Sequence, residues 1–200
     1  MGKGRDADAT SDIVEETKGD LLNLMSIINV RQGNFEQAAE YAKQCNDLDL
    51  KRGDPDMISS SYNTLTGIYM SMRQPKEAEK YILKAMEYAK KADNPQRKAV
   101  LNGMASEVYH KLGQEEQSLD YATRAYQLEQ RLGRKDKMAV RQAQRAASLI
   151  SLKRNVEAEK ALAEAIPGLR QEIEDFEGSC SGKRQSRIRI RDRSQFVVLL

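Results

Sequence analysis

Small side chains return every 40 residues along this chain, and this period constrains the fold more than any other feature. One series comprises Ala38, Ala78, Ser118 and Ala158, a second Cys45, Ala85, Ala125 and Ala165, and a third Tyr41, Tyr81, Tyr121 and Ala161. Several series in one register, with no insertion between the copies, indicate an internal repeat. Because each unit of such a protein buries its apolar face against the next, the sequence predicts four stacked copies of one structural unit.

Apolar residues within each unit follow the spacing of an α-helix, as Leu65 and Ile68 illustrate. Turn signals separate these stripes, either a glycine such as Gly33 or a capping residue followed by proline, as in Asp54-Pro55. The connections are short, so successive helices must pack antiparallel. We predict eight helices, over residues 10–32, 35–52, 55–72, 75–92, 95–112, 115–132, 135–152 and 155–174.

The composition agrees with exposed helical layers, since 32% of residues are charged and only 6% are aromatic. We predict an all-α fold, a right-handed α-solenoid of four antiparallel helix-turn-helix repeats. The repeat domain would span residues 10–176, with repeats at about 10–53, 54–93, 94–133 and 134–174. Residues 1–9 are expected to form a disordered N-terminus, and residues 177–200 a basic, flexible tail.

The run from Gly33 to Ala42, GNFEQAAEYA, resembles the turn and second-helix start of the tetratricopeptide repeat family. Ile68-Tyr69 and the run KEAEKY at 76–81 resemble further parts of that repeat, and the resemblance covers about residues 20–170. The usual unit has about 34 residues, so the longer period resembles a bacterial branch with MalT-like and Rap-like regions. The family's tryptophan is absent, and Arg145 occupies an expected apolar position. A HEAT-type stack also has long repeats, but its turn chemistry fits less well.

The resemblance implies a non-catalytic scaffold whose concave face, lined by the first helix of each pair, binds a protein or peptide. Carried over by register, the partner-binding residues would be Asn23, Ile27, Arg31, Asn63, Gly67, Met70, Glu107, His110, Lys111 and Ala147. Apolar, amide and charged groups are mixed in this set, which suits a peptide or helix lying in a groove. The alternative interpretation is that these residues only cover a solvated face.

Nothing in the sequence predicts an enzyme, a cofactor or a metal site. His110 is the only histidine, and no convergent partner accompanies it. Cys45 stands at a small-residue core position, which favours a structural thiol over a nucleophile. No phosphate-binding glycine loop occurs. With two widely separated cysteines, no secretory signal and no apolar run of membrane-spanning length, a cytoplasmic location is predicted.

The repeat pattern fails from about Gly178, where six basic residues stand against Asp192 alone. Such a segment has the charge to bind nucleic acid or an anionic membrane surface, but it carries no recognition motif. Leu162, Ile166 and Leu169 on the last predicted helix have no obvious cover. This end is expected to be covered by self-association, by the tail or by further sequence. The leading functional hypothesis is an adaptor, and the alternative is a sensory module of a bacterial signalling system.

Overall fold

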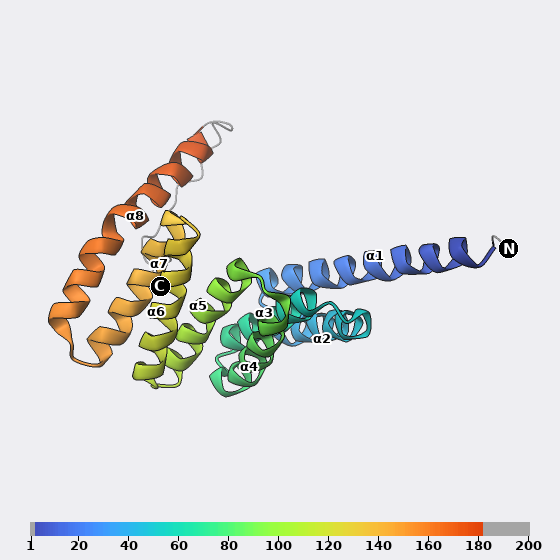
Figure 1. Ribbon diagram of the computed structural model, residues 1–200, viewed down its shortest axis with the longest axis horizontal. Coiled ribbons are helices and arrows are strands. Elements are labelled where there is room, and N and C mark those ends of the chain that lie inside the picture. Colours follow the sequence, from blue (N-terminus) through green and yellow to red (C-terminus); the bar gives the residue numbers. More distant parts are fainter. Residues whose placement is uncertain (1–2, 182–200) are drawn as a thin grey trace.

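The computed structural model describes the backbone of residues 3–181 and the side chains of residues 17–168 and Arg170. Within that range the chain is all-α and contains no strand, which confirms the predicted fold class. Its helices are α1 (Lys3–Gln32), α2 (Phe35–Arg52), α3 (Pro55–Ser71), α4 (Pro75–Ala92), α5 (Pro95–Lys111), α6 (Glu115–Arg131), α7 (Lys135–Ser151) and α8 (Asn155–Ser181). Figure 1 shows them following one another from the extended α1 to α8. None of the helices in the described range is long and apolar enough to cross a bilayer.

The predicted boundaries of the six inner helices agree with the structure to within one residue. The two outer helices are longer than expected, because α1 already begins at Lys3 and α8 continues to Ser181. No proline stands in either added segment, and a single glycine in each, Gly4 or Gly178, weakens a helix without ending it. The expected tail therefore begins inside α8, and its remainder from residue 182 lies outside the described residues.

Each repeat is a hairpin of antiparallel helices, and the turn inside the hairpin has the same backbone in all four copies. The first or second residue after the first helix has positive φ at each repeat, with values of 79° at Gly33, 56° at Arg73, 74° at Gly113 and 60° at Lys153. The next residue donates its backbone N–H to the carbonyl five positions earlier, as from Asn34 to Asn29 at 2.9 Å. Arginine and lysine accept this strained conformation because the surrounding hairpin enforces it.

Side-chain caps stabilise two of the three turns between repeats, whereas Arg134 before α7 makes no such hydrogen bond. Asp54 accepts hydrogen bonds from the backbone N–H groups of Asp56 and Met57 at 2.8 and 3.2 Å. Asn94 caps α5 in the same way, accepting from the N–H of Arg97 at 3.0 Å. Proline follows both caps at the first helical position, where the missing N–H has no partner to lose.

Buried small side chains allow the two helices of each hairpin to approach closely. The series Ala38, Ala78, Ser118 and Ala158 is buried in every repeat, as the periodicity predicts. Ser26 donates to the carbonyl of Ala38 at 3.0 Å, and Ser118 donates to that of Ser106 at 2.8 Å. These contacts place a side chain of one helix directly on the backbone of the other, so a larger residue has no room at the crossing.

The buried apolar residues form two clusters. The larger runs from Ala38 to Tyr109 through the first three repeats, and the smaller comprises Ala146, Leu149, Ala158 and Ala161. Stacked tyrosines flank the larger cluster, with ring centroids 5.1 Å apart for Tyr69 and Tyr81. The same pair recurs one repeat later in Tyr109 and Tyr121, at 5.2 Å. Apolar packing is therefore continuous through three hairpins, and a separate, smaller cluster stabilises the fourth.

Candidate partner-binding surface

The first helices of the repeats form one layer of the stack. In this layer α3 contacts α5 and α5 contacts α7, whereas the second helices α4 and α6, both fully described, make no comparable contact. In a curved stack of two layers, the layer whose members lie closer together is the inner one. The first-helix layer therefore lies on the concave side, as the family resemblance implies.

The predicted residues lie on this layer at equivalent positions of four helices. On α1, Asn23, Ile27 and Arg31 are exposed. On α3, Asn63, Gly67 and Met70 are half-buried. On α5, Glu107 and Lys111 are exposed and His110 is half-buried, and on α7 Ala147 is exposed. None of the ten is fully buried, so all retain surface that a partner could reach.

Glu107 does not stand free on this surface, because α7 provides it with a partner. The amide Nε2 of Gln144 donates to Glu107 Oε1 at 2.6 Å and to the carbonyl of Gly103 at 3.4 Å. Arg141 Nη1 in turn donates to Gln144 Oε1 at 2.9 Å. Although part of the Glu107 side chain reaches solvent, desolvation between α5 and α7 raises the pKa of its carboxyl, and the charge of Arg141 opposes the shift.

Behind this network lies a buried charge pair. Glu129 of α6 is fully buried, and its carboxylate lies 3.2 Å from Arg134 Nε and 3.9 Å from Arg141 Nε. Burial lowers the pKa of the Arg141 guanidinium, and the charge of Glu129 opposes that effect. A β-carbon on Gly103 would lie only 2.2 Å from Arg141 Cζ, so glycine is what leaves room for the guanidinium.

Sequence reasoning missed this network, although a signal for it was present. Arg141 occupies the register position that Leu21, Ser61 and Leu101 hold in the other repeats. Glu129 occupies the position that Ala89 holds in the second repeat. Two opposite charges appearing together at buried positions of adjacent helices indicate a pair. Only Arg145 was recognised as an exception to the pattern.

His110 is fixed by an acidic neighbour across the hairpin turn. Its Nδ1 lies 2.9 Å from Glu115 Oε2 at the start of α6. No group of three metal-ligating side chains occurs in the part of the chain that the structure describes. On this surface His110 presents an imidazole ring whose Nδ1 is engaged by Glu115.

The first-helix layer opens between α1 and α3, where a cleft of about 180 Å³ lies over the end of α2. Polar side chains make up most of its wall, and of the predicted residues only Asn23 lines it. The lining comprises Gly19, Asp20, Asn23, Cys45, Asp49, Arg52, Asp56, Met57, Ser60, Ser61, Thr64 and Arg97.

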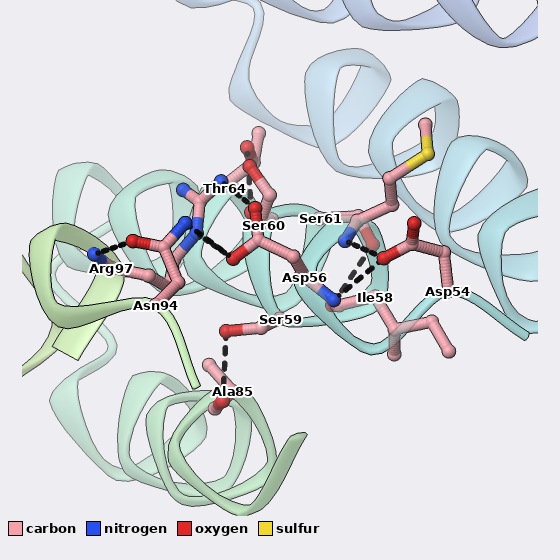
Figure 2. A network of polar contacts seen from close by, with 11 residues as sticks. Asp54, Asp56, Ile58, Ser59, Ser60, Ser61, Thr64, Ala85, Asn94 and Arg97 are labelled. Atoms are coloured by element: carbon pink, nitrogen blue, oxygen red, sulfur yellow. Dashed lines mark hydrogen bonds and ion pairs between the residues drawn. The ribbon is translucent and has the colours of Figure 1, made fainter. Parts of the chain in front are cut away.

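Arg97 and Asp56 form an ion pair in the lining of this cleft. Arg97 Nε and Nη2 lie 3.2 Å from the two carboxylate oxygens of Asp56, and Asn94 Nδ2 donates to Asp56 Oδ1 at 3.1 Å. Figure 2 shows this junction, with the Asp54 cap beside it. The bidentate geometry joins the start of α5 to the start of α3 and fixes that wall.

The part of the lining that α2 contributes contains one donor without a partner and one desolvated acid. Arg52 Nη2 is buried without a hydrogen-bond partner, beside Gly19. Desolvation raises the pKa of the Asp49 carboxyl, while the hydrogen bond with Ser61 and the charge of Arg52 oppose the rise. On the neighbouring inner face, Asn63 Oδ1 is also buried and unpartnered. Buried polar groups without partners are rare in folded proteins and call for an explanation.

Cys45 lines the cleft and is half-buried. Its thiol donates weakly to the carbonyl of Gly19 at 3.6 Å, and burial raises its pKa to about 11. A nucleophilic cysteine needs a lowered pKa. The interpretation of Cys45 as a structural thiol agrees with these surroundings.

Stacked helical hairpins with an accessible inner layer define the class of α-solenoids. Residues 59–91, within α3 and α4, match the family model of the tetratricopeptide repeat. That match covers one of the four hairpins, and the other three repeat its register, so the fold is a stack of tetratricopeptide-like repeats. Proteins built from this repeat are generally non-catalytic scaffolds.

Solved structures with the same architecture include BtubC (BKLC) from P. vanneervenii, with a TM-score of 0.69 and 18% identity over 87% of this chain and 68% of that chain. Another is the Signal Transduction ATPase with Numerous Domains (STAND) protein with a tetratricopeptide repeat sensor from Pyrococcus horikoshii. Its TM-score is 0.71 at 20% identity, over 82% of this chain but only 25% of that chain. Such identities establish the fold alone. Comparison with curated proteins gives no significant match.

Proposed function

We propose that this chain is a non-enzymatic scaffold that binds a protein or peptide segment along its first-helix layer. The observation that carries the proposal is the cleft between α1 and α3, where a buried guanidinium nitrogen of Arg52 has no partner. An unsatisfied buried donor costs free energy. Rotation of the Arg52 side chain towards the cleft would expose this nitrogen, and a ligand oxygen there would recover that free energy. The partner is therefore expected to place a backbone carbonyl or a carboxylate at Arg52.

The rest of the surface supports an extended ligand. From the cleft, the inner face continues over Asn63, Gly67 and Met70 towards Glu107 and His110. Apolar area and hydrogen-bonding groups alternate along this path, which suits a peptide or an amphipathic helix. Both acidic and basic side chains lie on this face. The orientation of a bound ligand would therefore depend on individual contacts rather than on a uniform electrostatic field.

Quantitative affinity capture from an extract of the native cell tests the proposal. Gly67→Arg blocks the middle of the inner face at little folding cost, because no neighbouring atom lies within 4 Å of an added β-carbon. Arg52→Met keeps the side-chain stem and removes the unsatisfied donor. Hydrogen bonds to charged groups contribute about 1.5–3 kcal/mol, so Arg52→Met should weaken partner binding roughly 10- to 100-fold.

Leu83→Arg is the matched control, since Leu83 is exposed on α4 in the second-helix layer. A partner that the wild type and Leu83→Arg retain equally, but Gly67→Arg and Arg52→Met lose, supports the assignment. Equal retention by all four proteins would place the binding surface elsewhere. No saturable partner at all would remove the scaffold function.

A second candidate function is a sensory or regulatory module whose output domain lies on another chain. The likeness to a protein with a tetratricopeptide repeat sensor favours this possibility, as does the long repeat, which resembles regions of bacterial regulators. Such a module would work in a reducing cytoplasm. The captured partner decides between the two: a nucleotide-hydrolysing or DNA-binding chain supports the sensor, and any other stable partner supports the adaptor.

A further inference from the structure

The interface between consecutive repeats uses equivalent register positions at the α2–α3 and α6–α7 junctions. Between α6 and α7 it is made by three residues of α7, each touching the second helix of the preceding repeat. These contacts join Arg141 to Glu129, Arg145 to Thr123 and Ser148 to Ser118. Between α2 and α3 the same face provides Ser61, which accepts from Asn46 at 2.8 Å.

On α1 the same positions are occupied by large apolar residues that no preceding helix covers. Three repeats before Arg141, Arg145 and Ser148 stand Leu21, Met25 and Ile28. Their exposed fractions are 57%, 42% and 43%. Side chains of this kind stand on a face that, in later repeats, packs against a second helix.

On α8 the complementary half of the interface is not covered by any described helix. Ala122 is fully buried on α6, and Tyr126 lies beneath the guanidinium of Arg145, 5.6 Å from its ring centroid. One repeat later their positions hold Leu162 and Ile166, which are 37% and 50% exposed. The last second helix thus carries an apolar face of the type that receives a first helix inside the chain.

We propose that copies of this chain associate head to tail, with the α8 face of one (Leu162, Ile166) seated on the α1 face of the next (Leu21, Met25, Ile28). A second copy is the occupant that these faces fit, because the same two halves already meet at α2–α3, α4–α5 and α6–α7. Such a heterologous contact extends the solenoid and leaves one free face at each end, so the assembly grows.

Sedimentation equilibrium and light scattering on the full chain, from micromolar to millimolar protein, test this directly. The wild-type mass should rise with concentration from the 22.6 kDa of one chain past that of two. The α1-face variant Met25→Glu/Ile28→Glu and the α8-face variant Leu162→Glu/Ile166→Glu should each remain single chains. Mixed in equal amounts they should form a species of two chains and no larger one, because each supplies the face that the other lacks.

Leu83→Glu is the control, since Leu83 is an exposed leucine, 48% accessible, outside both faces. It should assemble like the wild type, and circular dichroism should show equal helix content in all four proteins. A wild type that stays a single chain at every concentration overturns the proposal. So does an α1-face or α8-face variant that still self-associates alone, because that result means like faces pair, and so does a mixture that stays at one chain.

Discussion

At the scale of single residues, the two inner-layer glycines Gly67 and Gly103 have opposite roles. Gly67 has free space around it, whereas Gly103 leaves room for the guanidinium of Arg141. A β-carbon at Gly103 would force Arg141 away from buried Glu129. Substitution by alanine is thus expected to change the free energy of unfolding in opposite directions at the two sites.

Gly67→Ala should raise the free energy of unfolding by about 0.5–1 kcal/mol, because alanine loses less backbone entropy in a helix. Gly103→Ala should lower it by about 1–3 kcal/mol, because displacing Arg141 leaves a buried carboxylate poorly compensated. Urea unfolding followed by circular dichroism measures both. If Gly103→Ala proves as stable as the wild type, Arg141 moves without penalty and the buried pair contributes nothing.

Cys45 gives a pH-dependent prediction. With a pKa of about 11 against an ordinary 9.0, its thiolate fraction at pH 8 is lower by about 100-fold, and alkylation should slow by a similar factor. The measurement uses a Cys180→Ser background so that one thiol reacts. Urea-unfolded protein serves as the reference, and its thiol should be alkylated at the rate of an exposed cysteine. Fast labelling of the folded chain at pH 8 would show that burial does not protect the thiol.

The limits of sequence reasoning are clearest at this scale. Periodicity placed Asn23, Gly67 and their equivalents on one layer, because register depends only on spacing. It did not predict the cleft, since the opening between α1 and α3 depends on how neighbouring hairpins tilt. It also missed Arg52, which belongs to a second helix.

At the scale of helices, the hairpin crossing depends on small buried side chains. Ala78→Leu adds volume where the helices touch and should cost about 1–3 kcal/mol of stability. Ala147→Leu is the matched change at an exposed alanine of the inner layer and should be nearly neutral. Thermal melting compares the two variants. An unchanged midpoint for Ala78→Leu would show that the crossing can widen.

Helix boundaries were predictable wherever a breaker marks them. Caps such as Asp54 and turns such as Gly33 have local causes that can be read in the sequence. Arg73 and Lys153 adopt the same positive φ without being glycine, so only the repeat register identifies those turns. The start of α1 and the end of α8 have no proline or capping signal, so nothing in the residues marks those two boundaries.

At the scale of the whole molecule, stability is expected to vary along the stack. Neighbouring hairpins contact only each other, so local opening reflects the apolar contacts of each one. The large cluster supports α3 to α5, whereas α7 and α8 share a cluster of four small or medium residues. Amide hydrogen exchange should therefore give lower opening free energies in α7 and α8 than in α3 and α5. Uniform protection along the chain would mean that the stack opens as one unit.

The buried pair of Glu129 and Arg141 also bears on how such a chain can shorten during evolution. Removing residues 55–94 would join the Asp54 cap to Pro95 and leave Gly103, Glu129 and Arg141 together. Removing residues 95–134 would instead seat α7 against α4, where Asn63 and Ala89 stand at the places of Gly103 and Glu129. The units share one outline but are not interchangeable, because the first deletion would replace Ser61, the partner of buried Asn46, with Leu101, and the second would leave Arg141 without Glu129.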